Sequence, residues 1–171
     1  KGDASLCYDS NEPEGVSRAI GDLCTDIHRV TGRTLRTAVG NDLTRRPVII
    51  GTVGHSRLLD RLAANGKLSL DSLKGKWESS VVTVIDAPLP GVEQALVIAG
   101  SDRRGTIFAI YELSRQLGVS PWHWWADAPI RQRKQVYIRP SLHYSSGEPA
   151  VKYRGIFLND EAPALTGWVH E

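Results

Sequence analysis

Segments typical of strands alternate with segments typical of helices through most of this chain, and this alternation restricts the fold more than any other feature. Short apolar or alternating runs predict strands at residues 5–8, 35–39, 47–50, 81–85 and 95–99. Apolar residues at three- and four-residue steps predict helices at residues 16–31, 56–64 and 104–117. This order predicts an α/β domain with a mixed sheet and with helices packed on the sheet, in two or three layers.

The two segments richest in β-branched residues, 81–85 and 95–99, predict a pair of neighbouring strands. Residues 86–91 between them read Asp-Ala-Pro-Leu-Pro-Gly, a composition typical of a reversal. We therefore expect the two strands to pair in antiparallel orientation. Glycines at positions 32 and 118 and an Asn-Gly pair at 65–66 predict where the three helices end.

Composition changes after residue 118. Residues 121–125 read Pro-Trp-His-Trp-Trp and hold three of the five tryptophans, and prolines and a Ser-Ser-Gly run follow. These features predict a connector over residues 119–147, with a short strand at 135–138. The predicted organisation is therefore an N-terminal α/β domain at 1–147 and a second unit at 148–171.

The second unit begins with an apolar run that ends in three polar residues, Asn159, Asp160 and Glu161. In barrel enzymes the carboxyl ends of the strands present the catalytic side chains, so this pattern favours the first strand and loop of a (β/α)8 barrel. A barrel needs further strands, and we expect them to lie outside the sequence given. Side chains alternate along a strand, so Asn159 and Glu161 share one face. Such a pair can bind sugar hydroxyls, or one carboxyl group can act as an acid or a base. The simpler alternative is a strand that ends in a polar turn.

The loop at residues 100–105 has two interpretations. As a strand-to-helix loop it can hold an anion, and Arg103 or Arg104 can bind a carboxylate with two parallel hydrogen bonds. Alternatively, Ser101 or Asp102 caps the helix and the arginines pair with local acidic residues. Phosphate-binding and dinucleotide-binding glycine motifs are absent.

The tryptophan cluster also has two interpretations. Trp124 and its neighbours can stack on the apolar face of a sugar ring, or they can pack between this domain and the next. His123 is interpreted as a structural histidine, since no second ligand accompanies it.

Charge and composition exclude several classes of protein. A net charge of +2 with scattered basic residues argues against a nucleic-acid partner. No apolar run reaches the roughly 20 residues that cross a bilayer, so no membrane partner is expected. Cys7 and Cys24 are interpreted as two free thiols, with a disulfide as the alternative, and no metal site is expected.

Three motifs occur in order along the chain: Ser-Asp-Arg-Arg-Gly at 101–105, Gly-Val-Ser-Pro-Trp-His-Trp-Trp-Ala-Asp at 118–127, and Lys-Tyr-Arg-Gly-Ile-Phe-Leu-Asn-Asp-Glu-Ala-Pro at 152–163. Together they resemble glycoside hydrolase family 115, the xylan α-1,2-glucuronidases. The helix at 16–32 is also similar to the first helix of that family. The first motif alone recurs in hexosaminidases and family 67 glucuronidases.

The resemblance implies removal of glucuronic acid or 4-O-methylglucuronic acid from O2 of xylose in glucuronoxylan, with inversion and without a metal or organic cofactor. It implies that Glu161 takes part in substrate binding or catalysis and that Asn159 orients the substrate. It also implies secretion of the full-length protein, although the chain shows no signal peptide, and allows a homodimer formed through further domains. The alternative is a noncatalytic module that packs on a glycosidase barrel or binds polysaccharide.

Overall fold

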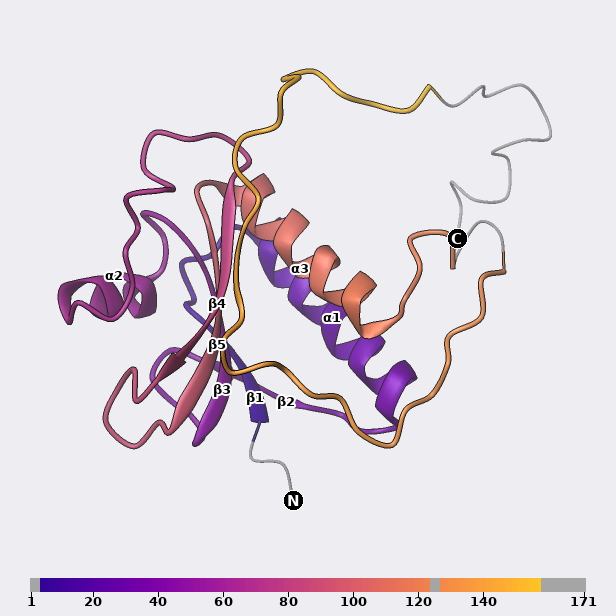
Figure 1. Cartoon of the computed structure of the whole chain (residues 1–171), viewed down its shortest axis with the longest axis horizontal. Coiled ribbons are helices and arrows are strands. Elements are labelled where there is room, and N and C mark those ends of the chain that lie inside the picture. The colour runs from indigo at the N-terminus through magenta and orange to yellow at the C-terminus, as the bar shows by residue number, and fades with distance from the viewer. Residues whose placement is uncertain (1–3, 124–126, 158–171) are drawn as a thin grey trace.

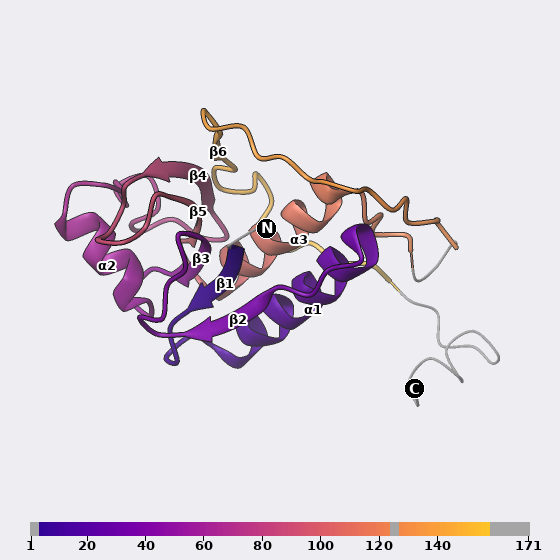
Figure 2. The same cartoon turned by 90° about the horizontal axis from the view of Figure 1, so that it is seen from below.

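The computed structural model describes residues 4–123 and 127–157 and shows a three-layer α/β arrangement (Figure 1). The strands are β1 (Ala4–Tyr8), β2 (Arg36–Val39), β3 (Arg46–Thr52), β4 (Ser80–Asp86), β5 (Gln94–Gly100) and β6 (His143–Ser145). The helices are α1 (Glu14–Thr31), α2 (Arg57–Ala64) and α3 (Arg103–Leu117). Helices α1 and α3 lie together on one face of the sheet and α2 lies on the other, as both views show (Figures 1 and 2).

The six strands form one sheet in the order β2-β1-β3-β5-β4-β6. The first four of these pair in parallel, whereas β4 runs antiparallel to both β5 and β6. The carboxyl ends of β1, β3 and β5 therefore lie at the same end of the sheet as the amino end of β4. The predicted mixed sheet and the predicted antiparallel pair are both confirmed.

Alternation along each buried strand divides the core into two halves. In β1, Leu6 packs toward α1 and α3 while Cys7 packs toward α2, and in β3 Ile50 and Ile49 divide in the same way. These side chains are completely buried, and burial of each leucine or isoleucine contributes roughly 1.5–3 kcal/mol. Cys24 packs in the α1 half, so the sheet separates it from Cys7 and both thiols are free.

The helix ends follow the residues that predict them. Helix α1 ends at Gly32, whose φ of 68° is easily reached only without a side chain. Helix α2 begins at Ser56, whose Oγ accepts a hydrogen bond from the backbone N–H of Leu59. Helix α3 ends at Gly118 in the left-handed conformation. Within the described part of the chain no helix has the length and apolar character required to cross a membrane.

The strand predicted at residues 135–138 is wrong. These residues have no ladder partner, and Val136, Tyr137 and Ile138 are exposed. The edge of β4 is paired instead with β6, in which Ser145 lies opposite Val81. A favourable composition alone does not form a strand in a segment that has no neighbouring strand to pair with.

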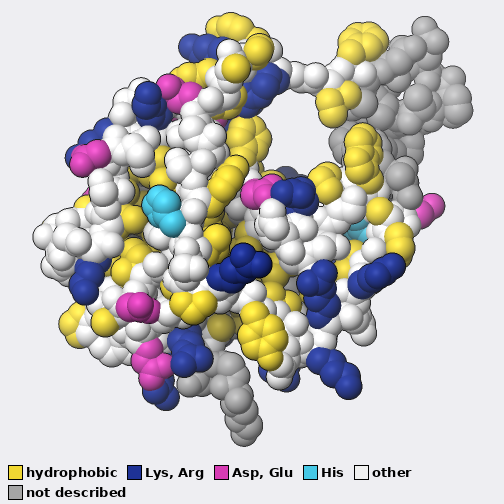
Figure 3. Space-filling model, in the orientation of Figure 1, with side chains coloured by type: hydrophobic (Ala, Val, Ile, Leu, Met, Phe, Trp, Pro, Cys, Tyr) yellow, Lys and Arg dark blue, Asp and Glu magenta, His cyan; other side chains and the backbone are white. Residues whose placement is uncertain are grey.

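The first barrel strand is also not observed over its described part. Residues 151–157 form no strand, and the side chains of Tyr153, Ile156 and Phe157 are exposed. Hydrophobic side chains are exposed at the top of the molecule, where this segment runs (Figures 1 and 3). A strand requires a neighbour for its backbone hydrogen bonds, and none of the described residues supplies one here. The start of a (β/α)8 barrel therefore stays a prediction.

Candidate functional site

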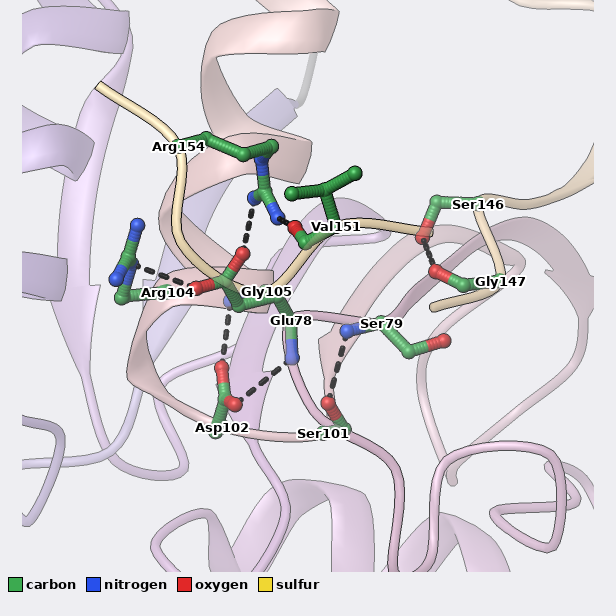
Figure 4. Close-up of polar contacts among 10 residues, drawn as sticks. All are labelled: Glu78, Ser79, Ser101, Asp102, Arg104, Gly105, Ser146, Gly147, Val151 and Arg154. Atoms are coloured by element: carbon green, nitrogen blue, oxygen red, sulfur yellow. Dashed lines mark hydrogen bonds and ion pairs between the residues drawn. The ribbon is translucent and has the colours of Figure 1, made fainter. Parts of the chain in front are cut away.

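The loop between β5 and α3 accepts hydrogen bonds both from the helix and from residues 78–79, which precede β4 (Figure 4). Asp102 caps α3, because its Oδ1 accepts the backbone N–H of Gly105 at 2.8 Å. Its Oδ2 accepts the backbone N–H of Glu78, also at 2.8 Å. Ser101 Oγ accepts the N–H of Ser79 at 3.0 Å. The predicted cap at this helix is confirmed, and the capping carboxylate also binds a second segment.

Gly105 is required by a close approach of two backbones. A Cβ atom at this position would lie 2.4 Å from the carbonyl oxygen of Ser79, well inside contact distance. Helix α3 can therefore approach the 78–80 segment only where its first turn carries a glycine. Capping and packing thus explain the serine, the aspartate and the glycine of the 101–105 motif.

Glu78 is the acidic partner of Arg104. Arg104 Nε lies 3.0 Å from Glu78 Oε1, and only 5% of the Glu78 side chain is exposed. The Arg104 guanidinium also lies 5.6 Å from the centre of the Phe108 ring. Arg103 is exposed, and it makes no hydrogen bond or ion pair within the described residues. Of the two arginines predicted to bind a carboxylate ligand, Arg104 is thus occupied by a local acid.

Arg154 binds the second carboxylate oxygen of Glu78. Its Nη2 pairs with Glu78 Oε2, and its Nη1 donates to the carbonyl oxygen of Val151. The guanidinium lies 5.7 Å from the centre of the Trp77 ring and 6.0 Å from that of Phe108. One buried carboxylate is therefore shared by an arginine of α3 and an arginine near the end of the described chain (Figure 4).

Residues 146–148 are bound to the same part of the domain. The N–H of Ser80 donates to Ser146 Oγ at 2.9 Å, and the N–H of Ser146 donates to the Ser80 carbonyl oxygen at 3.0 Å. Glu148 Oε1 accepts the N–H of Trp77 at 3.1 Å, and its Oε2 pairs with Lys76 at 3.2 Å. The Trp77 N–H, followed by the Lys76 ammonium, lowers the pKa of Glu148. The segment from 146 to 154 thus lies alongside residues 76–80.

A second buried carboxyl group, that of Glu12, lies at the carboxyl edge of β3. Its Oε1 accepts the N–H of Thr52 at 2.9 Å, and Thr52 Oγ1 lies 2.7 Å from Thr106 Oγ1. Its Oε2 is buried and has no hydrogen-bond partner within the described residues. Burial raises the pKa of Glu12 above its ordinary value. A raised carboxyl pKa occurs in acid and base catalysts, but here the side chain joins the loop between β1 and α1 to the end of β3.

The remaining predicted site residues lie outside the described part of the chain, whereas two neighbours of Trp124 lie within it. Asn159, Asp160, Glu161 and Trp124 lie outside the described residues. Trp122, the described tryptophan of that cluster, is 62% exposed. A ring nitrogen of His123 lies 3.1 Å from the Ala128 carbonyl oxygen, which agrees with the predicted structural role.

An open depression of about 450 Å³ lies beyond the end of α2, and none of the predicted site residues lines it; its lining includes Asp60, Leu68 and Lys74. Within residues 4–123 and 127–157, no group of three or more His, Cys, Asp or Glu side chains could hold a metal ion.

Sequence reasoning did not identify Glu78, Arg154 or Glu12 as residues of interest. Glu78 stands in a turn-rich segment without periodicity, and its partners lie 26 and 76 positions away along the chain. Arg154 falls within the 152–163 motif, which was the available signal. Long-range pairing of this kind leaves no trace in local sequence.

Comparison with known proteins gives two agreeing results. The family model described as Glycosyl hydrolase family 115 matches residues 146–171. A solved structure described as a novel family GH115 4-O-methyl-α-glucuronidase, BtGH115A, with specificity for decorated arabinogalactans, is 30% identical, with a TM-score of 0.79. That alignment covers 98% of this chain and 20% of BtGH115A, so the chain spans about a fifth of its length.

Two other results add no argument. The structure of CpGH84D is 12% identical over 69% of this chain and 18% of that protein, with a TM-score of 0.48, which is too distant to inform the fold. A search of curated proteins gave no match.

The match in sequence and the match in structure point to the same family. The chain belongs to glycoside hydrolase family 115, as the three sequence motifs implied.

Proposed function

We propose that this chain is the N-terminal portion of an enzyme that removes glucuronic acid or 4-O-methylglucuronic acid from O2 of xylose in glucuronoxylan, with inversion at the anomeric carbon. The observation that carries the proposal is the 30% identity to a 4-O-methyl-α-glucuronidase over 98% of this chain. The reaction requires no metal or organic cofactor. A (β/α)8 barrel that begins in residues 148–171 supplies the active site, and the full-length protein is secreted.

Within this proposal the chain supplies a small part of the active site. Inversion requires a carboxylic acid beside the leaving group and a carboxylate that activates water, roughly 6.5–9.5 Å apart. Glu161 binds the substrate or takes one of these roles, and Asn159 and Asp160 orient the sugar. Arg103 and Trp124 are further substrate-binding candidates. The partner of Glu161 comes from later strands, so the 171-residue chain alone is inactive.

A second substrate class follows from the relative. BtGH115A is described as specific for decorated arabinogalactans, which makes a terminal α-linked uronic acid on another polysaccharide the alternative substrate. Both substrates carry a uronic acid, so the same pocket can bind that sugar in either case. Specificity then depends on which polysaccharide backbone the enzyme binds.

The test is an assay of the longer protein that contains this chain. The protein is incubated with glucuronoxylan and, separately, with a glucuronidated arabinogalactan, and released uronic acid is quantified. Release from glucuronoxylan supports the proposal, and release from arabinogalactan alone moves the specificity to that of the relative. Absence of release from both substrates, with a folded protein, contradicts the proposed activity.

A further inference from the structure

The Glu78 carboxylate is a buried charge with two cationic partners. Its side chain is 5% exposed, and each oxygen pairs with a different arginine, Arg104 from α3 and Arg154 from the far end of the described chain. A buried carboxylate is tolerated only when it is paired and hydrogen-bonded. Both arginines together meet this requirement, since each satisfies one oxygen.

The backbone at Glu78 is held in an unusual conformation. Its φ is 49°, a left-handed value that a residue with a long side chain rarely adopts. The carboxylate of Asp102 accepts the Glu78 N–H at 2.8 Å and fixes this conformation. Strained backbone persists where surrounding contacts determine it, and it often marks a functional position.

Arg154 joins residues 151–157 to the domain through its ion pair with Glu78. Its side chain is 35% exposed, whereas Tyr153, Ile156 and Phe157 are at least 83% exposed. Its guanidinium lies over the rings of Trp77 and Phe108 while it pairs with Glu78. An arginine can combine a planar stacking contact with a charged hydrogen bond, and a lysine cannot do this equally well.

We propose that Glu78 is a positioning residue, a carboxylate anchor that binds Arg154 and fixes the course of residues 151–157 on the α/β domain. Asn159 follows Arg154 by five positions and Glu161 by seven, so the anchor sets where the chain leaves the domain toward these residues. The contacts that support this anchor all lie within the described chain. Its consequence for catalysis rests on the proposed function.

The test is the heteronuclear ¹⁵N NOE of the 171-residue chain, which reports backbone motion on the ps–ns timescale. In the wild type, amides of residues 151–157 should have values close to those of the strands. Glu78→Gln and Arg154→Gln should each lower these values to those of a free tail.

Two matched variants serve as controls. Glu93→Gln changes a carboxylate that also pairs with two arginines, Arg45 and Arg46, but at the opposite end of β5. Lys152→Gln removes a charge two positions from Arg154, and the contact seen for Lys152 is with the Tyr153 ring. Both should leave the values for residues 151–157 unchanged.

Tail-like values in the wild type, or unchanged values in both Glu78→Gln and Arg154→Gln, would overturn the proposal. If Glu78→Gln prevents folding, Arg154→Gln decides, because residue 154 lies in no helix or strand. The readout is independent of activity. An inactive longer protein with a rigid segment therefore contradicts the proposed function and leaves the anchor in place.

Discussion

Replacing Gly105 by alanine should destabilise the α/β domain, although alanine is the better helix former. The new Cβ would lie 2.4 Å from the Ser79 carbonyl oxygen and 3.1 Å from the Ser79 nitrogen. Both are backbone atoms, so no side chain can rotate away and the whole first turn of α3 must move. That movement also stretches the hydrogen bonds from Gly105 and Glu78 to the Asp102 carboxylate.

The expected magnitude combines three effects. Alanine favours a helix interior over glycine by about 1 kcal/mol. Overpacking of this kind costs about 1–3 kcal/mol. Weakening of the Asp102 cap costs roughly another 1 kcal/mol. The net loss is about 2 kcal/mol, which should lower Tm by about 4–8 °C for a domain of this size.

Gly21→Ala provides a matched control in another helix. Gly21 lies in α1, and a Cβ there would meet no atom within 4 Å. Alanine at this site should stabilise the protein by about 0.5–1 kcal/mol. Urea unfolding followed by circular dichroism measures both variants. If Gly105→Ala is as stable as wild type, or if both variants shift stability in the same direction, the structural explanation of the 101–105 motif is refuted.

Three further predictions concern charge, aromatic packing and the substrate. The folded-state pKa of Glu12 is raised. The carboxyl group is therefore neutral and without cost to the fold below the ordinary glutamate pKa of about 4.3, and it increasingly destabilises the fold as the pH rises from there through the raised pKa. Urea titrations should therefore show the stability of Glu12→Gln relative to wild type increasing with pH across that window, and a difference independent of pH would contradict the assignment. Trp122→Ala should change the stability of this chain by no more than about 0.5 kcal/mol, because the ring is exposed. It should destabilise the longer protein more if the ring packs between domains, and equal effects in both proteins would argue against that packing. In the longer protein, Glu161→Gln should reduce kcat/KM about ten- to two-hundredfold, mainly through KM, if it binds a sugar hydroxyl. A fall in kcat of about 10²–10⁴ with one altered limb of the pH profile would instead show an acid or base, and unchanged kinetics would show a surface turn.

The elements that the sequence predicts correctly are those specified by local chemistry. The β4 and β5 segments carry β-branched residues on either side of a proline-rich reversal, and each helix has a glycine or asparagine at its end. The Asp102 cap was one of two candidates because Ser101 and Asp102 have equivalent capping chemistry. The three-dimensional structure was needed to show that Asp102 caps while Ser101 binds Ser79.

The errors arise where a distant segment decides the outcome. Strand β6 has the sequence His-Tyr-Ser and exists because β4 offers it a free edge, whereas residues 135–138 have a more favourable composition and no partner. The same reason explains why Glu78 was missed. Its importance depends on Arg104 and Arg154, which only the folded chain brings to it.

The proposed function is that this chain is part of an inverting α-glucuronidase, and the anomeric form of the first product tests this proposal most directly. The longer protein is mixed with an aldouronic acid that carries α-1,2-linked 4-O-methylglucuronic acid, and the released sugar is followed by proton NMR before mutarotation proceeds. Inversion of an α-linkage predicts that the β-anomer appears first and that the α-anomer follows with the rate of mutarotation. Initial release of the α-anomer, or no release of the uronic acid, would contradict the account.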